Sequence, residues 1–429
     1  MGIVAGCGSS TTEGVPGPGG AGVRRSGGSG GTRPSTGDAS IDASGSGASP
    51  GGGAPSDGGY RRPYGDAAVW NRPVSEFGLS PRSAEFADRC YRYCSLAGPG
   101  KVSTYFDDYS IPVYDAREAT TTIRVFRAGF GYPGSIANGA SIPWTPSWKP
   151  GGGNDHIMVI LDPLTGKEID LWTAYLPGTT EQSTCITVEN IALGIGQAGN
   201  VLCAGGADVI QDETGKAIDY WTATTTYPIG GGYFEQYAML VTAAEVQAGA
   251  IRHAMNLTMY STMFGPQCSA ADLADPTKAG ETCGFWVNPA SRLEWASVPQ
   301  GCGANTQANT VAGRSRTVPE GSRFFIEASD AEIEKWLDSR AVAGALRRTA
   351  RIFAVALRDY GMIVTNTSCY DAGILTSGRV GPDAPLWATL GVPADTNQAL
   401  RILDGLITAT NLRTAAPSGP QVVGSNAVH

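Results

Sequence analysis

The chain carries the same strand-turn-strand pattern twice. Residues 161–174 read LDPLTGKEIDLWTA, residues 210–223 read IQDETGKAIDYWTA, and the two copies align without a gap. Both copies contain Thr-Gly-Lys after an Asp, and the glycine can take the positive φ that a tight turn needs. The residues that follow alternate as in a β-strand. The sequence therefore predicts two β-hairpins.

The predicted strands place an acidic and an aromatic side chain on one face. Asp170 and Trp172 share a face in the first copy, and Asp219 and Trp221 repeat the arrangement in the second. A carboxylate beside an indole can hold a sugar ring by hydrogen bonding and stacking. Burial of each tryptophan under a neighbouring loop fits the pattern equally well, so both interpretations stay open.

A histidine stands at the entrance of the first hairpin. Asp155 and His156 follow a glycine loop and precede the apolar run 157–161, which predicts a strand buried on both faces. Such rim positions often present functional side chains. The second copy has Ala207-Asp208 before its strand and no histidine. Catalysis is one interpretation, and a loop-capping Asp155 with a packed His156 is the other.

The composition excludes several classes of protein. The net charge of -8 argues against nucleic acid as a partner, because phosphate binding needs a basic surface. The sequence contains no run of eighteen apolar residues, so it predicts no membrane span. P-loop, dinucleotide, Gly-x-Ser-x-Gly and HExxH motifs are all missing from the sequence, so we expect no cofactor.

The nine cysteines indicate export. Cys7 ends Val-Ala-Gly-Cys, which resembles the lipobox of bacterial lipoproteins, so residues 1–7 are interpreted as the remnant of a lipoprotein signal. We expect an extracellular or cell-surface protein that meets the membrane only through a lipid on Cys7. The other eight cysteines form an even set, which predicts disulfides of undetermined pairing, with Cys185–Cys203 one possibility. Cys90 and Cys94 lack a second close pair, so we expect no metal site.

Four regions follow from the composition. After residues 1–7, residues 8–59 are rich in Gly, Ser and Pro and predict a disordered tether. Residues 65–412 are expected to form a single β-rich domain and residues 413–429 a flexible tail. Short strands, glycine and proline turns and few helices predict a mainly β fold, a β-sandwich or jelly-roll-like domain with a few peripheral helices. We expect a monomer.

Several motifs in this order resemble a widespread family of secreted bacterial β-rich proteins with no single established reaction. The motifs are Trp70-Asn71, Asp155-His156, Asp162, Asp170 with Trp172, Ile251-Arg-His-Ala-Met255, Trp286 with Pro289-Ala290, Gly321-Ser-Arg323-Phe and Tyr360-Gly-Met362. The resemblance implies export and a β-rich fold, and it places His156 and His253 at motif positions. Two departures are the insertion of Val-Asn after Trp286 and the second hairpin.

An enzyme acting on polysaccharide is the first functional hypothesis. Hydrolysis needs two carboxylates, which Asp170 with Asp155 or with Asp219 can supply. A lyase would use His156 or His253 as general base and a tyrosine as acid. The predicted catalytic residues are Asp155, His156, Asp170 and His253. The predicted substrate-binding residues are Trp172, Asp219, Trp221, Arg252, Trp286 and Arg323, the arginines neutralising a uronate carboxylate.

Two other hypotheses remain open. In the first, the duplicated Asp-x-Trp unit binds a glycan without breaking a bond, because two equal sites raise avidity, or the protein has a structural role at the cell surface. In the second, Asp155, His156 and His253 hold a metal ion. Their distance in the sequence makes the metal hypothesis the weakest.

Overall fold

The computed structural model describes residues 68–131, 134–162, 164, 167–196, 200–211, 234–295, 310–340, 342–368 and 371–418. The lipobox at Cys7, the tether 8–59 and the second hairpin with Asp219 and Trp221 lie outside the described residues. Within the described residues, no helix is long and apolar enough to cross a membrane.

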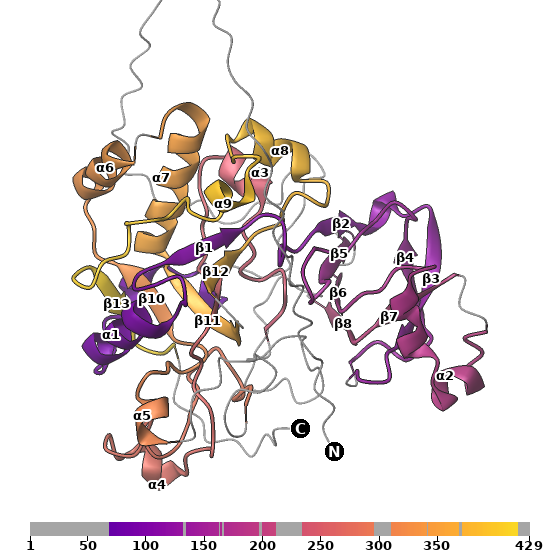
Figure 1. Cartoon of the computed structure of the whole chain (residues 1–429), viewed down its shortest axis with the longest axis horizontal. Helices are drawn as coiled ribbons and strands as arrows, with labels where there is room; N and C mark the ends of the chain where they lie inside the picture. Colours follow the sequence, from indigo (N-terminus) through magenta and orange to yellow (C-terminus); the bar gives the residue numbers. More distant parts are fainter. Residues whose placement is uncertain are drawn as a thin grey trace, which may run out of the picture. The chain divides into compact units, whose positions relative to one another are not determined.

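The largest sheet has six strands in the order β1-β12-β9-β11-β10-β13. Their bounds are β1 Val102–Tyr105, β12 Ala372–Leu375, β9 Met255–Met259, β11 Met362–Thr367, β10 Arg323–Ile326 and β13 Leu412–Thr414. β1 and β12 are parallel, as are β9 and β11, and the other neighbours are antiparallel. β1 from the start of the described chain therefore lies beside β12 from near its end (Figure 1).

The central strands of this sheet form the main core. Met255 and Leu257 of β9 and Met362 and Val364 of β11 are fully buried, as expected for strands covered on both faces. α7 packs against β10 and against α6, and α1 packs against β13. Phe353 is the fully buried centre of the apolar stripe of α7.

The chain between β1 and β9 forms two smaller sheets. The four-stranded sheet has the order β2-β5-β6-β8 and the three-stranded sheet the order β4-β3-β7 (Figure 1). Their bounds are β2 Val113–Asp115, β5 Met158–Asp162, β6 Lys167–Trp172, β8 Gly206–Gln211, β3 Thr121–Arg127, β4 Ser141–Trp144 and β7 Val201–Ala204. Ile160 and Leu171 share one apolar core with Val125 and Leu202 of the other sheet, as in a β-sandwich.

The first predicted hairpin is confirmed. β5 and β6 are antiparallel, with Asp162 opposite Lys167 at the turn. β8 pairs with the other edge of β6 in antiparallel register. β6 is therefore a central strand, and the first strand of the second sequence copy begins within β8, directly beside the first copy.

Short helices surround the sheets. They are α1 Ser83–Tyr93, α2 Val188–Ala192, α3 Ala243–Gln247, α4 Ala270–Leu273, α5 Val311–Arg314, α6 Asp330–Ser339, α7 Gly344–Asp359, α8 Ala384–Thr389 and α9 Thr396–Ala399, with 3-10 turns at Val69–Asn71, Val74–Glu76, Ala116–Glu118 and Thr180–Cys185. Two of them begin with complete capping boxes, Thr242 with Glu245 and Ser329 with Glu332. The predicted mainly β fold with peripheral helices is confirmed. β13 continues it past residue 412.

Disulfides join Cys90 to Cys94, Cys185 to Cys203 and Cys268 to Cys283. The bond between Cys185 and Cys203 links the turn Thr180–Cys185 to β7, as the sequence indicated. Cys302 and Cys369 lie outside the described residues.

Candidate functional site

Backbone strain in the described residues gathers at one place. Tyr109, His156 and Thr173 take positive φ values of 62°, 40° and 52° without being glycine. Thr173 N donates to the Asp155 carbonyl at 2.7 Å, and Tyr109 N donates to the Gly152 carbonyl at 3.0 Å. The strained residues therefore meet where the glycine loop enters β5 and where β6 ends. We call Asp155, His156, Trp172, Thr173 and Tyr175 the His156 corner.

Thr173 is the least expected member of this corner. A β-branched residue at positive φ is a conformational outlier that costs on the order of 1–3 kcal/mol. Its hydroxyl is buried and has no hydrogen-bond partner in the described part of the chain. Strain of this kind persists only where the surrounding structure enforces it, and it is found most often at functional sites.

The glycine loop, residues 151–153, is held tightly against its neighbours. Gly151 N donates to the Ile157 carbonyl at 2.8 Å, which closes the loop just before β5. A Cβ atom at Gly151 would lie 1.9 Å from the Ser110 carbonyl oxygen, so no other residue fits there. The loop therefore presents Asp155 and His156 from a fixed backbone.

Asp155 has an environment that favours its protonated form. Removal of water by the surrounding residues raises the pKa of Asp155 above its ordinary value. A hydrogen bond from the Trp172 side chain and the charge of His156 oppose this shift without cancelling it. Asp155 can therefore act as a proton donor or as a hydrogen-bond donor to an anion.

The Trp172 side chain packs against neighbouring residues, so of the two interpretations the structure favours burial over an open sugar-binding surface. Its ring meets Phe130 edge-on, with 6.3 Å between centroids, and a Cβ atom at Gly205 would approach the indole within 2.6 Å. Its hydrogen bond goes to Asp155. The structure therefore places Trp172 as a support for Asp155, with Phe130 and Gly205 occupying much of the surface that a sugar would need.

The ring of His156 lies against the ring of Tyr175, whose phenol group can donate a proton. Its ring lies 5.6 Å from the ring of Tyr175, in an edge-to-face arrangement, and both side chains are partly exposed. Burial, and then the charge of Glu181, raise the pKa of Tyr175 above its ordinary value. Tyr175 N donates to the Cys203 carbonyl at 2.7 Å, so the Cys185–Cys203 disulfide fixes the position of this tyrosine.

Asp170 lies on the inner side of β6. It is fully buried, and its Oδ2 accepts the Gln236 amide at 2.9 Å. Glu168, on the same face and also fully buried, accepts the Tyr237 amide at 2.9 Å. The two carboxylates thus hold the segment before α3, and this position gives Asp170 no open surface for a substrate. Glu168 stands two residues before Asp170, and this spacing in the sequence could have shown that Glu168 shares the face of Asp170 and Trp172.

His253 is a structural residue in a different setting. It is fully buried, with Nδ1 2.8 Å from the Ala254 carbonyl and Nε2 3.1 Å from Glu245 Oε1. These two contacts tie the chain just before β9 to the capping box of α3. His156 has a separate set of neighbours, which includes Tyr175 and Asp155.

The other predicted binding residues are dispersed. Arg252 is exposed, and Trp286 is buried in the main core. Arg323 is buried and donates to the carbonyls of residues 69, 72 and 360. In the described part of the chain, no group of three or more His, Cys, Asp or Glu side chains is placed to hold a metal ion. The proposed metal set of Asp155, His156 and His253 is therefore not brought together.

The sequence did not predict that Glu294 and Glu320 form a pair of acidic side chains. Glu320 is fully buried, and its Oε2 accepts the Glu294 amide at 3.0 Å. Glu294 Oε2 accepts the Thr367 amide at 2.7 Å, and the two carboxyl groups also contact each other. Burial raises the pKa of both groups, and that of Glu320 most. The sequence offers no signal for this pair, because the two residues come from separate connections.

Comparison of the chain with protein-family models, with curated proteins and with solved structures gives no match.

Proposed function

We propose that this chain is an exported protein acting on polysaccharide, and that the His156 corner is a lyase site for uronate-containing chains. The observation that carries the proposal is the approach of the His156 ring to the Tyr175 ring, 5.6 Å between centroids, in the corner where strained backbone gathers. A general base and a general acid side by side are what β-elimination requires.

The elimination uses the corner as follows. His156 takes the proton from C5 of the uronate, the released electron pair forms the C4–C5 double bond, and the C4–O bond breaks. Tyr175 gives its phenolic proton to the departing oxygen. The raised pKa of Tyr175 keeps that proton in place at neutral pH. In its protonated form, which the raised pKa favours, Asp155 donates a hydrogen bond to the uronate carboxyl group while negative charge develops there.

Hydrolysis has weaker support. It needs a second carboxylate roughly 5–10 Å from the first, and Asp170 is buried behind β6 with the Gln236 amide on its oxygen. Asp219 lies outside the described residues. The lyase is favoured because its base and its acid are both present at one partly exposed place.

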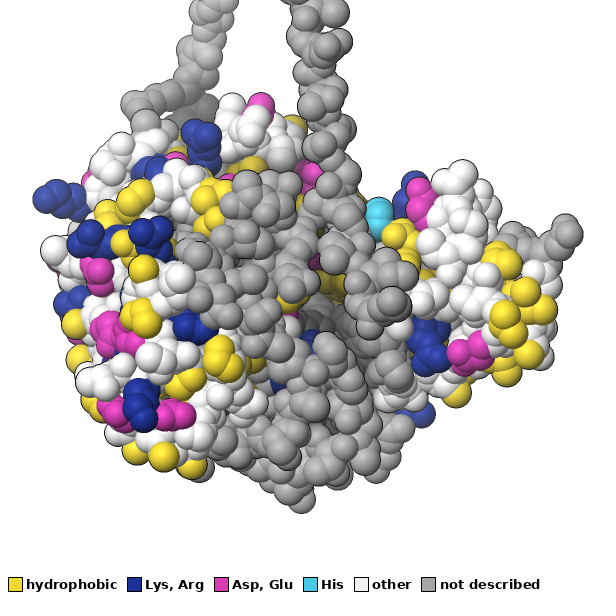
Figure 2. Space-filling view, turned by 60° about the horizontal axis from the view of Figure 1, so that its bottom comes forward, with side chains coloured by type: hydrophobic (Ala, Val, Ile, Leu, Met, Phe, Trp, Pro, Cys, Tyr) yellow, Lys and Arg dark blue, Asp and Glu magenta, His cyan; other side chains and the backbone are white. Residues whose placement is uncertain are grey.

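Two further features support export and a glycan partner. The Cys185–Cys203 and Cys268–Cys283 disulfides suit an oxidising compartment. Basic and acidic side chains are interspersed on the described surface visible in Figure 2, which suits a glycan better than nucleic acid. We retain as part of this proposal the lipid anchor at Cys7, the monomeric state and the relation to secreted β-rich bacterial proteins.

The test uses the full chain and a panel of uronate and neutral polysaccharides. A lyase releases unsaturated, ultraviolet-absorbing ends from uronate chains only. His156→Ala and Tyr175→Phe are expected to abolish this release while binding in a glycan affinity gel persists. Tyr260→Phe is the matched control. Tyr260 is a partly exposed tyrosine outside the corner, and its backbone amide donates to the Cys94 carbonyl.

Three outcomes contradict the proposal. Binding of a glycan without any bond cleavage, by wild type as by both variants, would identify a binding protein. Release of reducing ends without unsaturation would identify a hydrolase. Full turnover by His156→Ala would remove the corner from the mechanism in either case.

A further inference from the structure

A cavity of about 210 Å³ lies beside β10 and β13, and its lining shares no residue with the His156 corner. Its wall is mostly apolar, and the side chains that matter here are Val69, Phe77, Phe86, Val287, Pro289 and Ile363. Ligand pockets are typically about 300–1,000 Å³ and are lined mainly by apolar groups around a few polar ones. The cavity is smaller than this range and its wall is mostly apolar, so it suits a small molecule with an apolar body.

A buried cation forms part of the cavity wall. Arg323 is 5% exposed and lines the cavity. Its guanidinium donates to three carbonyl oxygens, Nε to Tyr360 at 2.6 Å, Nη1 to Val69 at 3.1 Å and Nη2 to Arg72 at 2.5 Å. Phe77 covers one face of the group, 4.9 Å from its centre. These contacts use three of the five N–H donors of an arginine.

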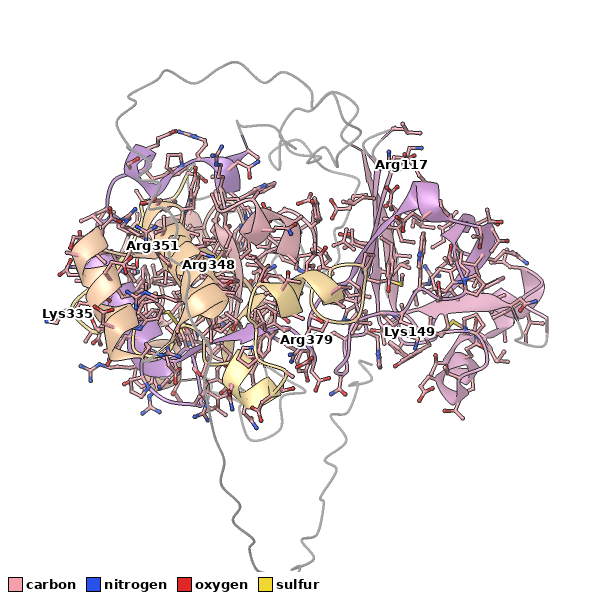
Figure 3. All side chains as sticks on the ribbon, turned by 90° about the horizontal axis from the view of Figure 1, so that it is seen from above. Arg117, Lys149, Lys335, Arg348, Arg351 and Arg379 are labelled. Carbon is pink, nitrogen blue, oxygen red and sulfur yellow. A yellow bond between two sulfur atoms is a disulfide. The ribbon has the colours of Figure 1, made fainter. Side chains whose placement is uncertain are left out.

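Arg323 has no carboxylate partner among the described residues, in contrast to other arginines. Arg379 pairs with Asp107, and Arg351 pairs with Glu334 at 2.7 Å; both arginines are labelled in Figure 3. The second arginine of the lining, Arg82, pairs with Glu85. Arg323 therefore forms no ion pair of its own at this cavity, and Glu76, the carboxylate whose charge acts on it, is paired with Arg72.

A buried charge without a counter-charge is unfavourable, because carbonyl dipoles replace water only in part. Burial first, and then the neighbouring charge of Arg72, lower the pKa of Arg323 to about 9. An anion in the cavity would supply the missing counter-charge and use the two remaining donors. The apolar wall would bury the rest of such a molecule.

We propose that this cavity binds a small organic carboxylate with an aromatic or branched aliphatic body. The carboxylate pairs with Arg323, and the body packs between Phe77, Phe86 and Ile363. The site is independent of the proposed lyase chemistry, and its ligand enters no step of that reaction.

Benzoate is the probe, titrated calorimetrically into the full chain. Acetate lacks the apolar body and benzyl alcohol lacks the charge, so both are expected to bind at least about tenfold more weakly than benzoate. Ala416→Phe adds a large side chain to the cavity lining from a partly exposed position and is expected to abolish binding. This variant keeps Arg323 and its three carbonyl contacts, so it tests the site without removing the clamp.

Arg323→Met removes the charge and is expected to lower benzoate affinity at least about tenfold in protein that keeps its wild-type melting curve. Arg351→Gln is the matched control, because it removes the same charge outside the cavity and is expected to leave affinity unchanged. Equal affinity for benzyl alcohol overturns the assigned ligand class. Undiminished benzoate binding by Ala416→Phe, or no binding by wild type, overturns the site.

Discussion

Replacing Glu320 with glutamine is expected to make the stability of the protein less dependent on pH. Glu320 is fully buried and contacts the carboxyl group of Glu294. Burial first, and then the charge of Glu294, raise the pKa of Glu320 well above its ordinary value of 4.5. Glu294 keeps part of its surface exposed, so we assign the larger effect to Glu320.

The sign follows from which state holds the proton. Above pH 4.5 the unfolded chain releases the proton of Glu320, whereas the folded protein retains it. The folded state then binds more protons, so the free energy of unfolding falls as pH rises. The stabilising contribution is complete below pH 4.5 and is lost as pH rises through the pKa of the folded state.

One retained proton sets the size of the effect. It contributes a slope of up to about 1.4 kcal/mol per pH unit to the free energy of unfolding. Glutamine has the shape of the protonated acid, its N–H can donate to Glu294, and its carbonyl can accept the Glu294 amide. Glu320→Gln is therefore expected to match wild type near pH 4 and to become increasingly more stable toward pH 7.

Urea unfolding of both proteins from about pH 4 to about pH 8 measures the slope. Glu118→Gln is the matched control, because Glu118 is exposed and its substitution changes the same charge. Parallel pH profiles for wild type and Glu320→Gln would refute the argument. A variant that matches wild type near pH 4 but is less stable toward pH 7 would show that the carboxyl group is needed in its charged form.

Three further changes test the fold. Loss of the Cys185–Cys203 bridge, which spans a sequence separation of 18, is expected to lower the free energy of urea unfolding by about 3 kcal/mol, and an unchanged midpoint would contradict this. Phe353→Ala, in the fully buried stripe of α7, is expected to cost about 3–5 kcal/mol in the same assay. His253→Leu removes one of the partners of Glu245, which also caps Thr242, and is expected to cost about 1–3 kcal/mol without changing glycan turnover. Loss of turnover in folded protein would return His253 to the mechanism.

Local sequence signals predicted local structure well. The turn after Asp162 and the alternation of β6 gave the hairpin. Each of these depends on residues a few positions apart.

Long-range pairing was not readable from the sequence. No pattern in residues 102–105 specifies a parallel partner at residues 372–375, and the division into three sheets depends on such pairings. The alternation in β6 also misled in part. It assigned Asp170 and Trp172 to a common face correctly, but the segment at Gln236 packs on that face and buries Asp170.

The candidate site was predicted in part. Asp155 and His156 stood out because only the first hairpin has them, and they lie in the corner of strained backbone. Tyr175 was not singled out, because its position depends on the disulfide and on β7. Glu320 escaped notice because burial of a carboxyl group depends on tertiary packing.

The pairing of β1 with β12 has a consequence for how the protein is made. At about 5–20 residues per second, the roughly 270 residues between Val102 and Ala372 take about 15–55 s to synthesise. The strands from β2 to β8 are complete well before β12 exists, so the sandwich can fold first. The six-stranded sheet assembles last, and an exported chain would complete it only after its C-terminal strands have crossed the membrane.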